Sequence, residues 1–271
     1  MTPTREDQRE HFRDVLRSIH LIMVESYKVR QVKVTPLGSE GSRLSIPIRV
    51  DGTDRNGSPV RYFAKILGGS DIMTEKTIQF LKNVYLQLEG RPALFNFTRS
   101  ARELAEHQYT TMGRIYRLGI PTAKPLGTFA LPGGMWLFVA EFLEAASQAS
   151  RKVSDDQLEE AFGHLRLMHK NGIFHGDIKP ENFLFADRVY IMDVGHYLED
   201  APDREKLAYD LACLMASFLD HATPEKVVKM AKKHYGVRDL KRAAGYIQLV
   251  DRRPDFKMTP GKRDRLMELL S

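Results

Sequence analysis

The stretch from His175 to Gly195 constrains the fold of this chain more than any other segment. It reads HGDIKPENFLFADRVYIMDVG and begins with a short polar loop. Two apolar runs follow, Phe183–Phe185 and Val189–Met192, and a polar turn at Asp187–Arg188 joins them. Short apolar runs separated by turn residues predict the two strands of a hairpin. Because a hairpin returns its second strand to the start of the first, Asp193 is expected beside the loop that precedes the hairpin.

The predicted loop and hairpin would gather four polar side chains. Asp177, Lys179 and Asn182 lie in the loop, and Asp193 follows the second strand. A carboxylate that can face a hydroxyl, an ammonium, an amide and a second carboxylate are the groups used to move a phosphoryl group from Mg-ATP. Asp and Asn also favour turns for purely structural reasons. That alternative does not account for the whole set at this spacing.

This stretch resembles the catalytic loop and metal-binding turn of the protein-kinase superfamily. The resemblance implies that Asp177 orients the attacking hydroxyl and accepts its proton, and that Lys179 lies near the transferring phosphate as a point charge. It further implies that Asn182 and Asp193 hold Mg²⁺, a hard cation that prefers oxygen ligands. His175 is expected to brace the loop rather than to act as a base.

The run Val60–Leu67 carries Lys65 inside an apolar sequence, where a charged residue is seldom left without a partner. It resembles the kinase strand whose lysine holds the α- and β-phosphates and pairs with a helix glutamate. A lysine that faces solvent is the alternative. Two strands, Val32–Pro36 and Leu44–Val50, are predicted before it, around a turn whose amides can face phosphate oxygens. This turn, which is similar to the loops of RIO-type atypical kinases and aminoglycoside phosphotransferases, consists of Gly38, Ser39, Glu40, Gly41 and Ser42.

The glutamate partner of Lys65 is sought on the next predicted helix, Ser100–Leu118, which Gly119 and Pro121 terminate. Two glutamates lie on this helix three positions apart, on neighbouring faces. Glu106 is the predicted partner, and Glu103 is the competing candidate.

A buried strand is predicted at Met135–Glu141, after a glycine turn. With the residues that follow, it resembles the kinase hinge, where backbone groups bind the adenine edge. By position, Glu141 would offer its carbonyl and Leu143 its amide.

The remaining segments predict a scaffold of helices. Arg5–Lys28 has an apolar stripe, and Ser154 opens a helix to Asn171 with a capping box. An insert at Gly68–Arg99 is expected to shape a substrate cleft or to cap the small lobe, and capping is favoured. In kinases an Asp near the start of a later helix ties down the catalytic loop, a role expected for Asp210.

These elements together predict an α+β, bilobal protein-kinase-like fold with a β-rich N-lobe and a mainly helical, truncated C-lobe. The predicted domains are an N-terminal helix (1–30), the N-lobe (31–143, with its insert at 68–99) and the C-lobe with the catalytic loop (144–271). No Ala-Pro-Glu motif follows Asp193, and Gly176 replaces the arginine that usually precedes the catalytic Asp. The resemblance therefore implies an enzyme that is not switched by activation-loop phosphorylation.

Composition adds weaker constraints. The chain has 41 Lys and Arg against 35 Asp and Glu, a formal net charge of +6. Four lysines are close to helical spacing, and three further basic residues lie beyond them: Lys226, Lys229, Lys232 and Lys233, then Arg238, Lys241 and Arg242. Such a stripe could meet RNA, an acidic partner or anionic lipid, although a solvated helix face is the simpler interpretation. The single cysteine, Cys213, fits a reducing compartment. With no apolar stretch long enough for a membrane span and no signal-peptide pattern, the prediction is a cytoplasmic protein.

The leading functional hypothesis is an ATP- and Mg²⁺-dependent Ser/Thr protein kinase of the small RIO-like kind, because the pattern Asp177-x-Lys179-x-x-Asn182 resembles such enzymes. A small-molecule or sugar kinase, similar to lipopolysaccharide kinases, is the second hypothesis. The His-Gly-Asp opening and the Gly-Ile-Pro-Thr turn at 119–122 favour it. A non-catalytic module that binds nucleotide is the third, and binding alone would not require Asp177.

Overall fold

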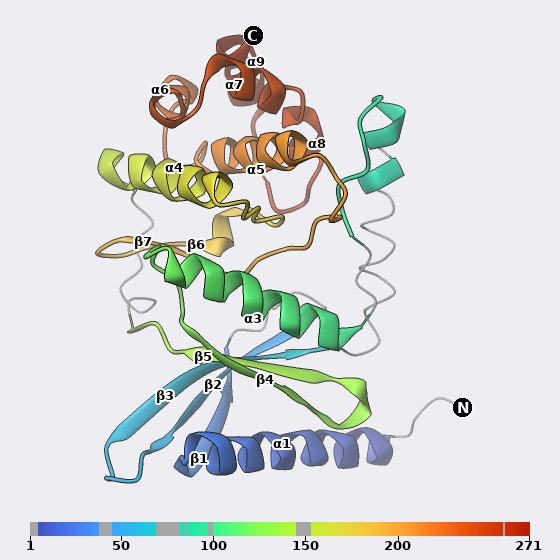
Figure 1. Ribbon diagram of the computed structural model, residues 1–271, viewed down its shortest axis with the longest axis vertical. Coiled ribbons are helices and arrows are strands. Elements are labelled where there is room, and N and C mark those ends of the chain that lie inside the picture. The colour runs from blue at the N-terminus through green and yellow to red at the C-terminus, as the bar shows by residue number, and fades with distance from the viewer. Residues whose placement is uncertain are drawn as a thin grey trace. The chain divides into compact units, whose positions relative to one another are not determined.

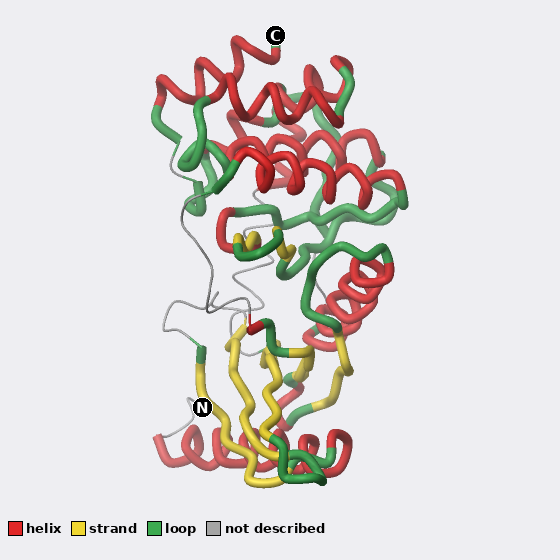
Figure 2. The backbone as a smooth tube through the Cα atoms, turned by 90° about the vertical axis from the view of Figure 1, so that its left-hand side faces the viewer, coloured by secondary structure: helices red, strands yellow, loops and turns green. Residues whose placement is uncertain are grey.

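The protein is described by a computed structural model, which places residues 5–37, 45–68, 82–84, 86–96, 100–144, 153–256 and 258–271. The chain divides into two compact units. The N-terminal unit contains the five-stranded sheet, and most of the helices belong to the C-terminal unit (Figures 1 and 2). This is the α+β class that the sequence predicts. Within the described ranges, no helix combines the length and the apolar character that crossing a membrane requires.

The N-terminal unit is built on an antiparallel sheet in the order β1-β2-β3-β5-β4. Lys65 lies in the central strand β3, where it pairs with Pro47 of β2 and Phe138 of β5. The central position explains why the run around Lys65 is apolar, since both neighbours bury its backbone. The strands are β1 (Arg30–Pro36), β2 (Ser45–Thr53), β3 (Pro59–Leu67), β4 (Pro125–Ala130) and β5 (Trp136–Glu141).

Helix α1 (Arg5–Tyr27) belongs to the same unit and contributes to its core. Val15, Ile19 and Met23 recur every four residues and are buried against sheet residues such as Val50 and Val139. This spacing places them on one face of the helix. Phe12, three positions before Val15, is 58% exposed.

Helix α3 (Ala101–Arg117) matches the predicted helix within one residue at each end. Gly119 follows with a φ of 75°, in the left-handed region that ends helices. The next residues, Pro121 and Thr122, continue into the C-terminal unit. There the backbone carbonyl of Pro121 accepts a hydrogen bond from the amide of Ile191, and the Thr122 hydroxyl donates to the Ile191 carbonyl at 2.7 Å.

The C-terminal unit combines helices with the predicted hairpin. The capping box of α4 is present: the Ser154 hydroxyl accepts from the Gln157 amide, and the Gln157 side chain accepts in return. The hairpin strands are β6 (Phe183–Phe185) and β7 (Val189–Ile191), and a short 3₁₀ turn at Pro180–Asn182 precedes them. The helices are α4 (Asp155–Lys170), α5 (Asp203–Ser217), α6 (Pro224–His234), α7 (Val237–Ala244), α8 (Ile247–Asp251) and α9 (Pro260–Leu270).

Of the insert, residues 82–84 and 86–96 belong to the C-terminal unit, and the expected capping of the small lobe stays a prediction. Phe95 forms a β-bridge with Tyr197 and stacks on its ring at 5.9 Å between centroids. Asn83 is buried and bonds the backbone of Leu94 and Phe95. Within the insert, residues 82–84 and 86–88 are helical.

The basic residues that the sequence analysis singled out lie on two helices: the four lysines from Lys226 to Lys233 are on α6, and the three from Arg238 to Arg242 are on α7. Lys226 pairs with Asp155 at 2.6 Å, and Lys233 pairs with Glu159. Both partners lie on α4. These two lysines therefore serve the packing of α6 against α4.

Candidate active site

The predicted catalytic loop lies between α4 and the β6–β7 hairpin, and the turn that contains Asp193 lies directly against it. The Gly195 amide donates to the His175 carbonyl at 2.7 Å. A Cβ on Gly195 would stand 2.6 Å from the Gly176 carbonyl carbon, so only glycine permits this approach. Asp193 itself has a φ of 53°, a left-handed conformation that Asp tolerates better than most residues. The hairpin thus brings the Asp193 turn beside the Asp177 loop, as the sequence predicts.

Asp210 of α5 fixes the backbone of this loop, which confirms the expectation from sequence. Its side chain is fully buried and accepts from the amides of His175 (2.7 Å) and Gly176 (3.0 Å). The Tyr197 hydroxyl donates to the same carboxylate at 2.8 Å. His169 contacts it at 3.3 Å. Because both loop amides bond one rigid helix, the backbone before Asp177 has a defined position.

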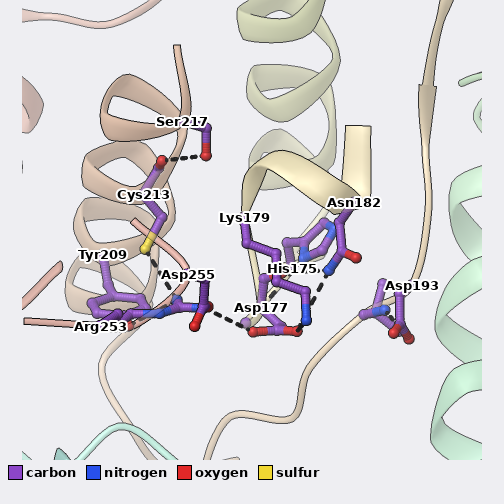
Figure 3. A network of polar contacts seen from close by, with 12 residues as sticks. His175, Asp177, Lys179, Asn182, Asp193, Tyr209, Cys213, Ser217, Arg253 and Asp255 are labelled. Atoms are coloured by element: carbon purple, nitrogen blue, oxygen red, sulfur yellow. Dashed lines mark hydrogen bonds and ion pairs between the residues drawn. The ribbon is translucent and has the colours of Figure 1, made fainter. Parts of the chain in front are cut away.

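Asp177 lies at the centre of a network of polar contacts (Figure 3). Its Oδ2 is 3.2 Å from the Lys179 ammonium and 3.4 Å from the Asn182 amide nitrogen. Burial alone would raise the pKa of this carboxyl group, but Lys179, Arg253 and Lys82 outweigh that effect and hold the pKa well below its usual range. The side chain keeps 30% of its surface exposed. Asp177 is therefore an accessible anion at neutral pH.

Lys179 faces two carboxylates. Burial would lower the pKa of its ammonium, but the charges of Asp177 and Asp193 outweigh burial and raise the pKa. The side chain is 24% exposed, so the ammonium is held in place while part of its surface remains open. A fixed cation at this point can meet the negative charge of a phosphoryl group.

Asn182 and Asp193 supply oxygen atoms suited to a metal ion. The Asn182 amide nitrogen donates to the Asp177 carbonyl at 2.7 Å, which leaves the amide oxygen on the side of Asp193 (Figure 3). An amide oxygen and a carboxylate are hard donors that fit Mg²⁺, which takes few protein ligands beside phosphates and water. Over the described ranges, no group of three or more His, Cys, Asp or Glu side chains could hold a metal ion.

His175 has the bracing role expected of it. It is fully buried and stacks on Phe183, with the two ring centroids 6.3 Å apart. Its Nδ1 accepts from the Asp177 amide at 3.3 Å. Burial lowers the pKa of the imidazole below its ordinary value, so the ring is neutral at physiological pH.

Arg253 is a site residue that the sequence did not reveal. It follows α8 and is 5% exposed. Its Nη2 donates to Asp177 Oδ1 at 3.1 Å and also bonds Asp255. Only a long-range contact makes Arg253 part of the site, and no local motif marks it.

The donor-side candidates lie in the N-terminal unit. Lys65 is in β3 and Glu106 is on the exposed surface of α3, where its carboxylate accepts from Arg102 at 2.7 Å. Glu103, the competing candidate, lies in the first turn of α3. The Glu141 amide bonds the Lys124 carbonyl, and Leu143 lies just beyond β5. The predicted phosphate-binding turn, Gly38, Ser39, Glu40, Gly41 and Ser42, lies outside the described residues.

Solved kinases are among the structures to which this chain is similar. For the PknI kinase domain of Mycobacterium tuberculosis, the TM-score is 0.44 at 13% identity, over 89% of this chain and 96% of that one. For the amicoumacin kinase hAmiN, the TM-score is 0.44 at 12% identity, over 98% of this chain and 95% of that one. No family model matches the sequence.

Curated proteins give sequence matches. The chain is 25% identical over 136 residues to the RIO-type serine/threonine-protein kinase Rio1 of Thermoplasma acidophilum, a match that covers 46% of this chain and 70% of that protein. It is 30% identical over 93 residues to the EKC/KEOPS complex subunit BUD32 of Enterocytozoon bieneusi, which covers 34% of this chain and 41% of that protein. The second match thus spans less than half the length of its relative.

Proposed function

We propose that this chain is a kinase of the atypical branch of the protein-kinase-like superfamily, and that it transfers the γ-phosphate of ATP to a Ser or Thr hydroxyl of a protein. The sequence match to a RIO-type serine/threonine-protein kinase supports the proposal. One observation carries the proposal: Asp177 is a fixed, partly exposed anion beside the Lys179 ammonium. Phosphoryl transfer passes through a loose transition state, so a site of this kind works mainly by position and charge.

Asp177 would orient the acceptor hydroxyl and take its proton as the new ester bond forms. The low pKa of this group makes it a weak base, which suits a proton that leaves late in a loose transition state. Positioned bases of this kind contribute about 10²–10⁴-fold in rate. Lys179 would stabilise the negative charge on the transferring group, and Asp210 would keep the loop from moving away.

The kinase resemblance also suggests which groups would hold the nucleotide and its metal ion. Asn182 and Asp193 would hold Mg²⁺, which when bound bridges phosphate oxygens and neutralises their charge. Lys65 would bind the α- and β-phosphates and pair with Glu106 or Glu103. The backbone at Glu141 and Leu143 would bind the adenine edge, as the resemblance implies.

A small-molecule or sugar acceptor is the second candidate. The Gly-Ile-Pro-Thr turn at 119–122 favoured it from sequence. In the structure Pro121 and Thr122 of that turn bond Ile191 of β7, which gives the turn a scaffold role in either kind of enzyme. The turn therefore does not discriminate between acceptors, and the pattern Asp177-x-Lys179 continues to favour a protein. A role of the basic helices in binding RNA is not part of the proposal, because Lys226 and Lys233 pair with α4.

A transfer assay with γ-labelled ATP and Mg²⁺ tests the proposal against three acceptor pools: the protein itself, a mixed protein substrate and a panel of sugars and other small alcohols. Label on Ser or Thr is expected, and we expect Asp177→Asn to reduce transfer by about 10²-fold or more. Asp187→Asn is the matched control, since Asp187 lies in the exposed turn of the same hairpin and bonds only Tyr190 among the contacts found there.

The outcomes separate the hypotheses. Label that appears only on small alcohols would refute a protein acceptor and support the second candidate. Nucleotide binding without transfer to any pool, unchanged in Asp177→Asn, would refute catalysis and support a binding module. Equal loss of transfer in Asp187→Asn would show that the Asp177 effect is not specific.

A further inference from the structure

The C-terminal segment after α8 reaches back to the candidate catalytic base. Arg253 lies 76 residues beyond Asp177 in the chain, yet its Nη2 is 3.1 Å from Asp177 Oδ1. The guanidinium is 5% exposed, and its central carbon lies 4.9 Å from the centre of the Phe256 ring. Buried charges persist only when they are paired. Arg253 and Asp177 are therefore structural partners.

Two neutral groups on α5 anchor the other end of the guanidinium. Nη1 donates to the Tyr209 hydroxyl at 3.2 Å and to Cys213 Sγ at 3.6 Å. Burial raises the pKa of Tyr209 well above its usual value and that of Cys213 to about 12, so neither group carries charge at neutral pH. The positive charge of Arg253 is therefore compensated by Asp177 and Asp255 alone among these contacts.

The two oxygens of Asp177 have different partners. Oδ1 bonds Arg253, while Oδ2 faces Lys179 and Asn182 (Figure 3). Without Arg253, the carboxylate could rotate about its last bond and bring both oxygens to Lys179. Lys179, which is now 3.2 Å from Oδ2, would then be held by both oxygens and could serve a phosphoryl group less well.

We propose that Arg253 is a positioning residue, which fixes the rotation of Asp177 so that Oδ2 faces the acceptor and Lys179 stays available. This inference rests on the proposed function, because it assigns Arg253 a role toward the candidate base. The planar fork of arginine joins α5 to Asp177, and the shorter point charge of lysine cannot make the same set of contacts.

The first test compares Arg253→Gln and Arg253→Lys with the matched control Arg252→Gln, a change at the exposed neighbouring arginine. We expect kcat to fall by about 10²-fold in Arg253→Gln, as a misplaced catalytic group does, with little change in KM for ATP. Arg253→Lys should recover a minor part of kcat. Arg252→Gln should retain both constants. A rise in KM for ATP with unchanged kcat would overturn the proposal.

The second readout does not need activity. The carboxyl carbon of Asp177 can be followed by NMR at one neutral pH, with the signal assigned by its loss in Asp177→Asn. Because the Arg253 guanidinium donates to Asp177 Oδ1, Arg253→Gln should change the chemical shift of this carbon, whereas the control Arg252→Gln should leave it unchanged.

These outcomes keep the two proposals apart. If the wild-type protein transfers no phosphate to any acceptor, the proposed function fails, while the NMR signal still tests whether Arg253 holds Asp177. An unchanged chemical shift of the Asp177 carboxyl carbon in folded Arg253→Gln would overturn the positioning role. If Arg253→Gln does not fold, Tyr209→Phe decides: it removes one anchor of the guanidinium, and kcat is expected to fall about fivefold, the worth of one hydrogen bond. An unchanged kcat and an unchanged chemical shift in Tyr209→Phe would overturn the proposal.

Discussion

Replacing Asp210 offers the sharpest test of how the catalytic loop is held. Asp210 is fully buried and accepts from the His175 and Gly176 amides and from the Tyr197 hydroxyl. Asp210→Ala leaves these donors without a partner, and each buried unsatisfied donor costs roughly 1–3 kcal/mol. Because a small cavity can admit water to one of them, we expect the free energy of unfolding to fall by about 3–5 kcal/mol.

Asp210→Asn separates shape from hydrogen bonding. The asparagine amide keeps the size of the side chain, but its nitrogen would face an N–H group where an oxygen now accepts. We expect Asp210→Asn to lower the free energy of unfolding by about 2 kcal/mol, less than Asp210→Ala does. Asp203→Asn is the matched control, because Asp203 lies in the first turn of the same helix and its side chain is 74% exposed. Asp203→Asn should lower the free energy of unfolding by less than about 1 kcal/mol.

Urea unfolding followed by far-UV circular dichroism measures these free energies. Hydrogen exchange of the peptide that contains His175 and Gly176 reports on the loop itself, and both Asp210 variants should accelerate exchange there before global unfolding. An Asp210→Ala protein with wild-type stability and wild-type exchange in that peptide would refute the conclusion that Asp210 anchors the loop. If Asp203→Asn lowered the free energy of unfolding as much as the Asp210 variants do, burial of Asp210 would not explain their effect.

Two further predictions concern the C-terminal unit. Asn83→Ala removes bonds from Oδ1 to the Leu94 and Phe95 amides and from Nδ2 to the Phe95 carbonyl, and it should lower the free energy of unfolding by about 2–4 kcal/mol, measured in urea; an unchanged midpoint would contradict this. Burial raises the pKa of Cys213 to about 12, above its unfolded value, so the thiol should resist a thiol-reactive disulfide reagent at about pH 8 in the native protein and react once urea unfolds it. Rapid labelling of the native protein would count against that burial.

Much of the secondary structure is predictable because its signals are local. The helix predicted at Arg5–Lys28 is observed as Arg5–Tyr27, and Phe183–Phe185 is a strand with the predicted bounds. Ser154 caps its helix as its sequence pattern indicates. In each case, apolar periodicity or a capping residue acts over a few positions. Such an element can therefore be predicted without knowledge of its long-range contacts.

Strand β4 (Pro125–Ala130) could not be predicted in the same way. Its sequence contains Pro125 and Gly127, residues that disfavour strands. It nevertheless forms the edge of the sheet, beside β5 only. At an edge, one side of the strand donates no ladder hydrogen bonds, so a proline costs little there. The position in the sheet, which the sequence does not state, makes this strand possible.

In the candidate site, too, local patterns could be predicted from the sequence and long-range contacts could not. Asp177, Lys179 and Asn182 lie within six positions of one another, so the kinase-like resemblance could be drawn from sequence, and the match to a RIO-type kinase agrees with it. The bridge between Phe95 of the insert and Tyr197 could not be predicted, because the two residues lie about a hundred positions apart. The role of the insert stays a prediction. The roles given to Lys65, Glu106 and the hinge stay predictions.

Helix α5 explains why stability and the geometry of the site cannot be separated in this protein. Asp210 bonds the backbone of the loop, and the neighbouring Tyr209 anchors Arg253, which holds the side chain of Asp177. One helix therefore controls Asp177 at both its main chain and its carboxylate. Because a buried helix shifts as a unit, a core substitution beneath α5 should move both contacts together, so that variants that loosen its packing lose the orientation of Asp177 before they lose the fold.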